Sequence, residues 1–128
     1  MVDLDPYQVT ADVLKTLGHP ARLQILEVLA AEGEACVCHL EWRLGYRQAY
    51  LSQHLARLRE AGLVNDHRDG LNIYYSLVTP DLRALLASLK QSLTILAPDM
   101  ANIEMANGDP SRPCPCPRCN PTSVSTTA

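Results

Sequence analysis

The 128-residue chain has no phenylalanine and a single tryptophan, and aromatic residues make up only 5% of it. Hydrophobic residues still account for 47%, so a core must be built from leucine, isoleucine, valine and alanine, which favours packed helices over a β-sandwich. The length suffices for one domain and is too short for two well-packed ones. No apolar run approaches the roughly 18 residues of a membrane span, so we expect no membrane partner.

The chain also lacks an excess of positive charge, because eleven basic residues stand against fourteen acidic ones and the formal net charge is −3. This total gives no indication of nucleic-acid binding. The charges are unevenly placed, however. Residues 1–34 carry six acidic and two basic side chains, whereas residues 35–78 carry five arginines and four acidic residues. No acidic residue lies between Arg47 and Arg59. The basic part of the chain is therefore the segment 35–78.

The chain also lacks the even set of cysteines that is typical of secreted domains held together by disulfides, because it has five. The first residues have no apolar stretch of the kind a signal peptide needs, so we expect a cytoplasmic protein with reduced thiols. Metal binding or redox sensing is then a better explanation of the cysteines than a disulfide framework. They form two groups along the chain: Cys36 and Cys38, then Cys114, Cys116 and Cys119.

Proline composition marks the end of the folded part. Five of the nine prolines fall within the last nineteen residues, at positions 110, 113, 115, 117 and 121. A segment of this composition cannot bury a core. We therefore predict a globular domain over residues 1–105 and a flexible tail, rich in proline and cysteine, over residues 106–128.

Apolar spacing predicts five helices and one hairpin in the globular part. The helices are expected near residues 9–17, 20–32, 37–44, 47–61 and 80–100, with His19 and Thr79 as N-caps of the second and fifth. Residues 63–68 and 72–78 are predicted strands, joined by a two-residue turn at Asp69-Gly70. The predicted fold is mainly α with a β-hairpin, in the order α-α-α-α-β-β-α.

Two short helices joined by a tight glycine-containing turn and followed by a hairpin form a winged helix-turn-helix. Its second helix enters the major groove of double-stranded DNA, where amides and hydroxyls suit base edges and arginines suit phosphates. The expected DNA-binding residues are Arg47, Gln48, Ala49, Tyr50, Ser52, Gln53, His54, Arg57 and Arg59 on the helix and Arg68 and Gly70 at the hairpin tip. Helical spacing leaves open whether His54 faces DNA or the core, and a good N-cap residue is missing near residue 47.

The last predicted helix has a leucine stripe larger than so small a domain needs. Core packing accounts for about half of it, and we expect the rest to pair with a second copy in a homodimer, assisted by the first helix. The expected dimerisation residues are Leu14, Leu82, Leu85, Leu86, Leu89, Leu93 and Leu96.

Cys36 and Cys38 open the third predicted helix. Residues two apart point about 200° from each other on a regular helix, so both sulfurs can hold one ion only at a frayed helix start. Holding an ion there would distort the element that positions the recognition helix. The alternative is that either cysteine is a small buried hydrophobic residue.

The three tail thiols are packed too closely between prolines to be core residues. Clustered thiolates suit As(III) or Sb(III) with three sulfurs, or Cd, Pb, Zn or Cu(I) with three or four. Three interpretations remain open: an adventitious cluster, an independent second site, or ligands that join Cys36 and Cys38. His39, next to Cys38, is a further candidate ligand, although a solvated histidine explains it as well.

Four segments of the chain resemble the ArsR/SmtB family of bacterial metal-sensing repressors, over about residues 10–97. They are residues 17–26 (LGHPARLQIL), 35–40 (ACVCHL), 51–64 (LSQHLARLREAGLV) and 68–77 (RDGLNIYYSL). The resemblance implies a homodimeric winged helix that represses its own operon and releases DNA when it binds a toxic metal or metalloid. Cys36 and Cys38 resemble the third-helix thiolate site of the arsenic- and cadmium/lead-responsive branches.

The sequence departs from each branch of that family. Glu41 stands where the arsenic branch often has a third cysteine, and the N-terminal thiols of the cadmium/lead branch are missing. Residues 81–100 contain no histidine, which the zinc/nickel/cobalt branch needs there. We therefore hypothesise that the tail folds back, within one subunit or between two, so that Cys114, Cys116 and Cys119 complete the site.

The sequence thus predicts a repressor that releases operator DNA when cysteine thiolates bind As(III) or Sb(III). The alternatives are a repressor of the same fold that responds to Cd(II) or Pb(II), and a thiol redox or persulfide sensor. A disulfide between cysteines two apart would be strained, so a redox sensor is expected to need a tail-to-helix bond. No phosphate-binding loop, nucleophile elbow or H-E-x-x-H motif occurs, so we expect neither an enzyme nor a catalytic cofactor.

Overall fold

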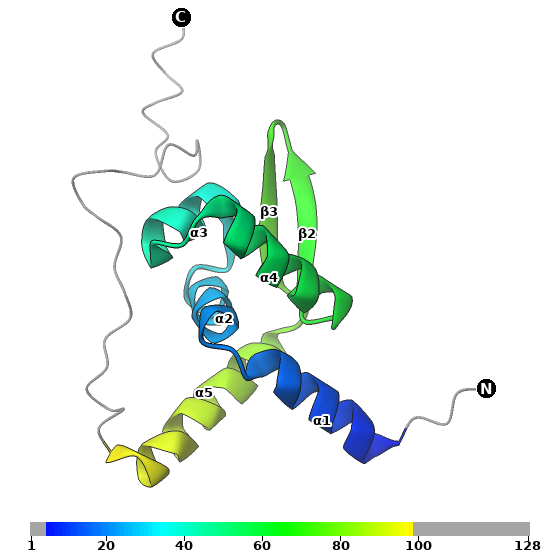
Figure 1. Ribbon diagram of the computed structural model, residues 1–128, viewed down its shortest axis with the longest axis vertical. Coiled ribbons are helices and arrows are strands. Elements are labelled where there is room, and N and C mark those ends of the chain that lie inside the picture. The colour runs from blue at the N-terminus through cyan, green and yellow to red at the C-terminus, as the bar shows by residue number, and fades with distance from the viewer. Residues whose placement is uncertain (1–4, 99–128) are drawn as a thin grey trace, which may run out of the picture.

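The computed structural model describes residues 5–98, which form five helices around a three-stranded antiparallel sheet (Figure 1). In chain order the elements are α1 Pro6–Leu17, α2 Pro20–Glu32, β1 Glu34–Cys36, α3 Val37–Leu44, α4 Gln48–Glu60, β2 Val64–Asp69, β3 Asn72–Leu77 and α5 Pro80–Leu96. The predicted tail, residues 106–128, lies outside the described range, so its boundary stays a prediction. No helix within residues 5–98 is long and apolar enough to cross a membrane.

Two helix starts follow directly from the local sequence. His19 Nδ1 accepts the N–H of Ala21 at 3.2 Å, and Thr79 Oγ1 accepts that of Asp81 at 2.8 Å. A proline follows each cap at the first helical position, where its missing N–H costs nothing and its fixed φ suits the helix. Both predicted caps are confirmed.

The core is aliphatic, as the absence of phenylalanine predicts. Its fully buried side chains come mainly from α2 and α4, which pack against each other and against the sheet. The largest are Ile25, Leu26, Leu29, Leu40, Leu51, Leu55 and Leu58. Because these leucines hold the inner face of α4, the opposite face of the helix is left to solvent.

The sheet contains one strand that the sequence did not reveal. Residues 34–36 form β1, which pairs antiparallel with β3, so the strand order is β1-β3-β2 and the predicted element order lacks one strand. The hairpin turn also differs by one residue from the prediction. Asp69 pairs with Asn72, which makes Gly70 and Leu71 the two turn residues, and Gly70 has φ +64°.

Helices α1 and α5 extend away from the body, at the end opposite the hairpin tip (Figure 1). Leu82 and Leu86 of α5 are buried in the core of this one chain, and Leu89 packs against that core, so the expectation that Leu82 and Leu86 are free to pair with another copy is wrong. Several other apolar side chains of the two helices stay exposed: Tyr7, Val9, Leu14, Leu85, Leu93, Ile95 and Leu96.

Candidate DNA-binding surface and thiol site

The turn between α3 and α4 is tight because Gly45 ends α3 in the left-handed conformation, with φ +76°. Helix α4 then starts at Gln48. Its N-cap residue, Arg47, forms no capping hydrogen bond from its side chain to α4. The sequence indicated this missing cap. The only change to the predicted span of 47–61 is one residue at each end.

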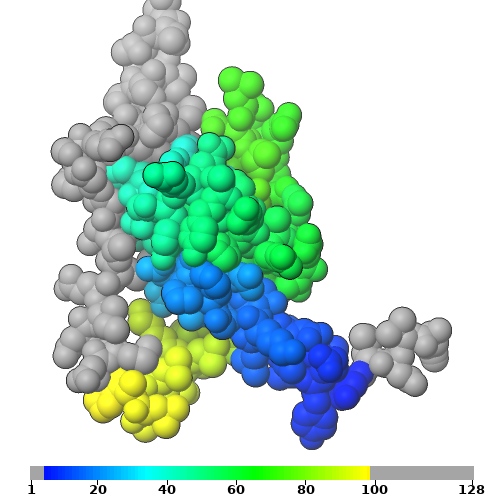
Figure 2. Space-filling model, viewed as in Figure 1, coloured from blue at the N-terminus to red at the C-terminus, as the bar shows by residue number. Residues whose placement is uncertain are grey.

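The outer face of α4 carries most of the predicted DNA contacts. Gln48, Ala49, Tyr50, Ser52, Gln53 and Arg57 are all exposed. The segments of α3, α4 and the hairpin lie next to one another in the upper half of Figure 2. Small and amide side chains occupy the centre of this face, and Arg57 lies toward the helix end, a distribution that fits close approach to a groove edged by phosphates.

His54 does not belong to that outer face. It is only 8% exposed, and its Nδ1 accepts a hydrogen bond from Arg22 Nε at 3.1 Å. Burial, then the nearby His19 and Arg22, lower the pKa of His54 below its ordinary value of 6.5. The structure thus decides the open question in favour of the interior, and His54 as a base contact is wrong.

The wing carries Arg68 and Gly70 on exposed positions, as predicted. Arg59, predicted as a phosphate contact, is already engaged, because its Nη1 lies 2.9 Å from Oδ2 of Asp66 in β2. This ion pair joins the end of the recognition helix to the base of the wing. Nothing in the sequence pattern singled out Asp66.

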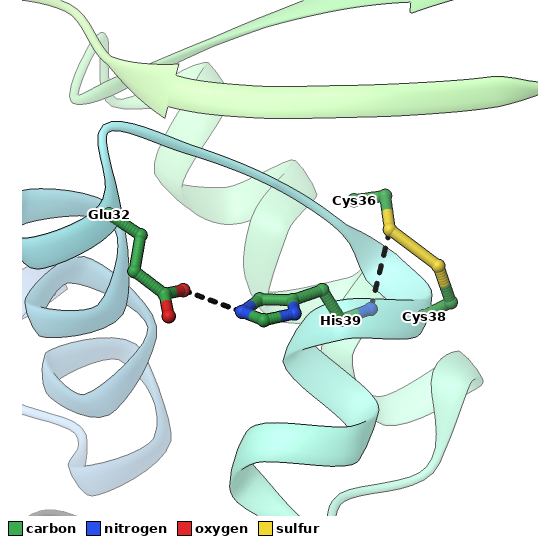
Figure 3. The surroundings of a disulfide bond; sticks show 4 residues. All are labelled: Glu32, Cys36, Cys38 and His39. Carbon is green, nitrogen blue, oxygen red and sulfur yellow. Dashed lines mark hydrogen bonds and ion pairs between the residues drawn. A yellow bond between two sulfur atoms is a disulfide. The ribbon is translucent and has the colours of Figure 1, made fainter. Parts of the chain in front are cut away.

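The thiol pair lies where β1 becomes α3. Cys36 has extended backbone angles (φ −84°, ψ 166°) and serves as N-cap of α3, while Cys38 lies in the first turn. Their Cα atoms are 5.4 Å apart and a disulfide joins the two sulfurs (Figure 3). The sulfurs thus meet at the helix start, where the spacing argument allowed them to meet, and they do so without unwinding α3 because Cys36 precedes the helix. The disulfide joins the pair directly, without a tail cysteine.

Cys36 also supports the helix start. Its Sγ accepts the backbone N–H of His39 at 3.3 Å (Figure 3). The ring of His39 turns the other way and meets the carboxylate of Glu32, with Nε2 and Oε2 2.6 Å apart. Arg43 Nε lies 3.7 Å from the same carboxylate. The start of α3 is thus held on one side by a cysteine sulfur and on the other by the end of α2.

Aromatic side chains that the sequence did not indicate enclose the sulfurs. Cys36 and Tyr74 are buried together, with Cys38 and Trp42 packed against them. Cys36 pairs across the sheet with Tyr74, which pairs in turn with His67 of the wing. The rings of His67 and Tyr74 stack at 5.7 Å. One row of side chains therefore runs from the thiols to the wing.

Once reduced, Cys36 and Cys38 supply two soft thiolate ligands side by side. Within residues 5–98 no group of three histidine, cysteine or acidic side chains is placed to hold a metal ion. Cys114, Cys116 and Cys119 lie outside the described range, so their relation to Cys36 and Cys38 stays a prediction. A three-sulfur site needs at least one ligand from beyond this part of the chain.

Comparison with known proteins supports the fold and the DNA-binding unit. The model of the bacterial regulatory protein arsR family matches residues 19–66, which span α2 to the start of the wing. The chain is 39% identical over 93 residues to the HTH-type transcriptional regulator Rv0081 of Mycobacterium tuberculosis, covering 73% of this chain and 82% of that one. The crystal structure of Rv0081 has a TM-score of 0.68 and covers 77% and 99%.

Two further relatives carry functional names. The arsenic resistance transcriptional regulator ArsR1 of Pseudomonas putida is 35% identical over 108 residues, covering 81% of this chain and 84% of the relative. The crystal structure of the transcriptional repressor BigR from Xylella fastidiosa has a TM-score of 0.61 and 39% identity, covering 66% and 86%. With these matches over its winged helix, the chain belongs to the arsR family and is a DNA-binding transcriptional repressor, not an enzyme.

Proposed function

We propose that this repressor reads operator DNA with the outer face of α4 and the wing, and that it releases the DNA when As(III) or Sb(III) binds Cys36 and Cys38. One observation carries the proposal: two sulfurs lie together at the first turn of α3, and one of them caps that helix. The inducer site is thus part of the helix that precedes the recognition helix.

Ligand binding acts on α3 through the cap. An arsenic or antimony atom that takes the Cys36 sulfur as a ligand withdraws electron density from the acceptor of the His39 N–H, which weakens one hydrogen bond at the helix start. It also changes the packing of the sulfurs against Tyr74 and Trp42. Because α3 packs on α4 and Tyr74 belongs to the hairpin, both DNA-contacting parts shift together.

The third sulfur comes from the tail in this proposal. As(III) prefers three soft ligands, and the described residues provide a pair of thiols without a third. The tail holds three cysteines within six residues. The tail folds back onto Cys36 and Cys38, within one subunit or across a dimer. The missing ligand then comes from the tail cysteines Cys114, Cys116 and Cys119. Cd(II) or Pb(II), which bind the same sulfurs, are the variant inducers.

A redox or persulfide sensor is the second candidate, and the disulfide between Cys36 and Cys38 favours it. In that case an oxidant takes two electrons from the two thiols, and their two protons leave as the bond closes. The sulfur of Cys36 then still caps α3, so DNA release would come from the changed contact with Tyr74 and Trp42.

A titration on DNA tests the inducer. Reduced full-length protein is bound to a labelled duplex that it has selected from a randomised library. As(III), Sb(III), Cd(II), Pb(II) and Zn(II) are then added, and a mild oxidant is added in a separate arm, for the wild type, Cys36→Ser and Cys38→Ser. We expect As(III) and Sb(III) to release wild-type protein at concentrations that leave both variants bound.

The tail is tested by replacing Cys114, Cys116 and Cys119 together by serine. We expect this variant to bind DNA normally and to need at least tenfold more As(III) for release, because a two-sulfur site remains. Release that is unchanged removes the tail from the site. If only the oxidant releases DNA and none of the thiophilic ions does, the protein is a redox sensor and not a metalloid sensor.

The remaining parts of the proposal concern assembly and location. A homodimer covers the exposed apolar side chains of α1 and α5, and a two-fold pair of winged helices presents two recognition helices to successive major grooves. A repressor whose inducer site consists of reduced thiols works in the cytoplasm.

A further inference from the structure

The contact between α2 and α4 contains a part-buried polar network at the edge of the aliphatic core. Arg22 donates from Nε to His54 Nδ1 at 3.1 Å and from Nη1 to the carbonyl oxygen of Thr16 at 3.2 Å. One guanidinium therefore ties the end of α1, the start of α2 and the middle of α4 together. Apolar side chains alone would not fix α4 at one rotation on α2, whereas a directional hydrogen bond does.

Aromatic rings extend the network toward the DNA-facing start of α4. The ring centroids of His54 and His19 are 4.3 Å apart, and Tyr50 meets His54 edge to face at 4.5 Å. Tyr46 packs on Tyr50 at 5.1 Å, and its hydroxyl donates to Gln24 Oε1 at 2.6 Å. His54 is thus the centre from which the side chains around the exposed first turns of α4 are supported.

The hydrogen bond from Arg22 requires the His54 ring to be neutral. Because Nδ1 accepts from Arg22, the neutral ring carries its proton on Nε2, and a second proton removes the only acceptor. The ionisable groups placed against the ring are His19 and Arg22 from the start of α2 and Tyr50 from α4 itself. Burial, His19 and Arg22 all lower the pKa of His54, so near neutral pH the ring is uncharged and the contact is intact.

We propose that neutral His54 is the positioning residue that holds the recognition helix at its DNA-binding angle, through Arg22, so that protonation of this ring weakens operator binding. The proposal rests on α4 being the reading helix. It assigns His54 no contact with DNA, and it makes operator affinity depend on pH without any change at the thiols.

The direction of the effect separates this role from ordinary electrostatics. Protonating histidines on a DNA-binding protein adds positive charge, which strengthens contacts with phosphates. A positioning role predicts the reverse. Since the pKa of His54 in the folded protein is lowered, the affinity should be constant at alkaline pH and should fall as the pH drops through that pKa.

The experiment measures affinity for the library-selected duplex by fluorescence anisotropy between pH 8 and pH 5, at fixed ionic strength, with reduced, chelator-treated full-length protein. Wild type should weaken toward pH 5 by a factor that follows the protonated fraction of the His54 ring. His54→Asn places an amide oxygen where Nδ1 lies and cannot be protonated there, so it should bind within threefold of wild type at pH 8 and lose no affinity toward pH 5. His54→Ala, which has no acceptor, should be at least tenfold weaker at pH 8.

His67→Asn is the matched control, because it removes an exposed histidine of the wing and leaves the α2–α4 contact intact. It should keep the wild-type loss at acid pH. An acid loss that persists in His54→Asn, a wild type that is flat or tighter at pH 5, or an asparagine variant as weak as the alanine variant overturns the proposal.

A measurement without DNA separates this proposal from the assignment of α4. The NMR titration of the His54 ring, identified by its absence in His54→Asn, should show a pKa below 6.5. A value at or above 6.5 overturns the proposal. If Gln53→Ala leaves base preference unchanged while the pH results hold, Gln53 is not a base contact and the positioning role of His54 stands.

Discussion

The Sγ atom of Cys36 accepts the backbone N–H of His39 at 3.3 Å, so a candidate inducer ligand is at the same time the N-cap of α3. Sulfur is a weak acceptor, and serine, threonine, aspartate and asparagine are the preferred caps. A cysteine at this position therefore exchanges some helix stability for the ability to bind a soft ion or to form a disulfide.

This double role predicts that Cys36→Ser and Cys36→Ala differ in stability. Serine keeps a cap acceptor and alanine does not, so the serine variant should be more stable by about 1 kcal/mol. Both variants should fail to respond to As(III). Urea unfolding of the reduced proteins, followed by circular dichroism, measures the difference. The same pair of substitutions at Cys38, which is not the cap, serves as control and should differ by less than about 0.5 kcal/mol.

The Arg59–Asp66 pair predicts a variant with tighter DNA binding. Asp66→Ala removes the carboxylate that holds the Arg59 guanidinium at 2.9 Å and takes a negative charge off the proposed DNA-binding surface. One additional phosphate contact steepens the dependence of log K on log salt by about 0.9. We expect affinity to rise two- to fivefold at low salt, as measured by anisotropy from 50 to 200 mM salt. An unchanged salt slope would show that Arg59 does not reach a phosphate.

Gln53 and Arg57, neighbours on the exposed face of α4, are predicted to contribute in different ways. Gln53→Ala should cost about 1–3 kcal/mol on the selected duplex and relax the preference at one base pair, as expected of a base contact. Arg57→Ala should weaken all sequences by a similar factor and lower the salt slope, as expected of a phosphate contact. Competition with duplexes that each carry one base-pair change distinguishes the two.

The elements that form from nearby residues could be predicted from the sequence. Periodic leucines locate α4, a proline follows both His19 and Thr79 at helix starts, and Gly45 ends α3 where a glycine is expected. Strand β1 was missed because three residues are too few to show alternation, and it exists only through pairing with β3, some forty residues later. A non-local contact of that kind leaves no local pattern.

The candidate site likewise has features that a local sequence pattern predicts and features that it does not. The outer face of α4 follows from Leu51, Leu55 and Leu58, but His54 was assigned to DNA because its polarity outweighed its position. Leu51, His54, Leu55 and Leu58 complete an i, i+3, i+4, i+7 pattern, and that signal places His54 inside. The disulfide was unexpected because a bond between cysteines two residues apart was expected to be strained, whereas Cys36 lies at the end of β1 with extended backbone angles.

Leu93 provides the test of the proposed dimer. It is exposed on α5, as are Leu85 and Leu96, and these three share one face at 100° per residue, whereas Gln91 lies on the opposite face. A buried, unpaired carboxylate costs several kcal/mol, so Leu93→Glu should shift the protein to a monomer at micromolar concentration and weaken operator binding more than tenfold. Gln91→Glu adds the same charge outside this face and should leave both properties unchanged. Sedimentation velocity gives the mass of each variant, and circular dichroism confirms that the monomer is folded. A Leu93→Glu protein that still sediments as a dimer would mean that α5 does not form the interface.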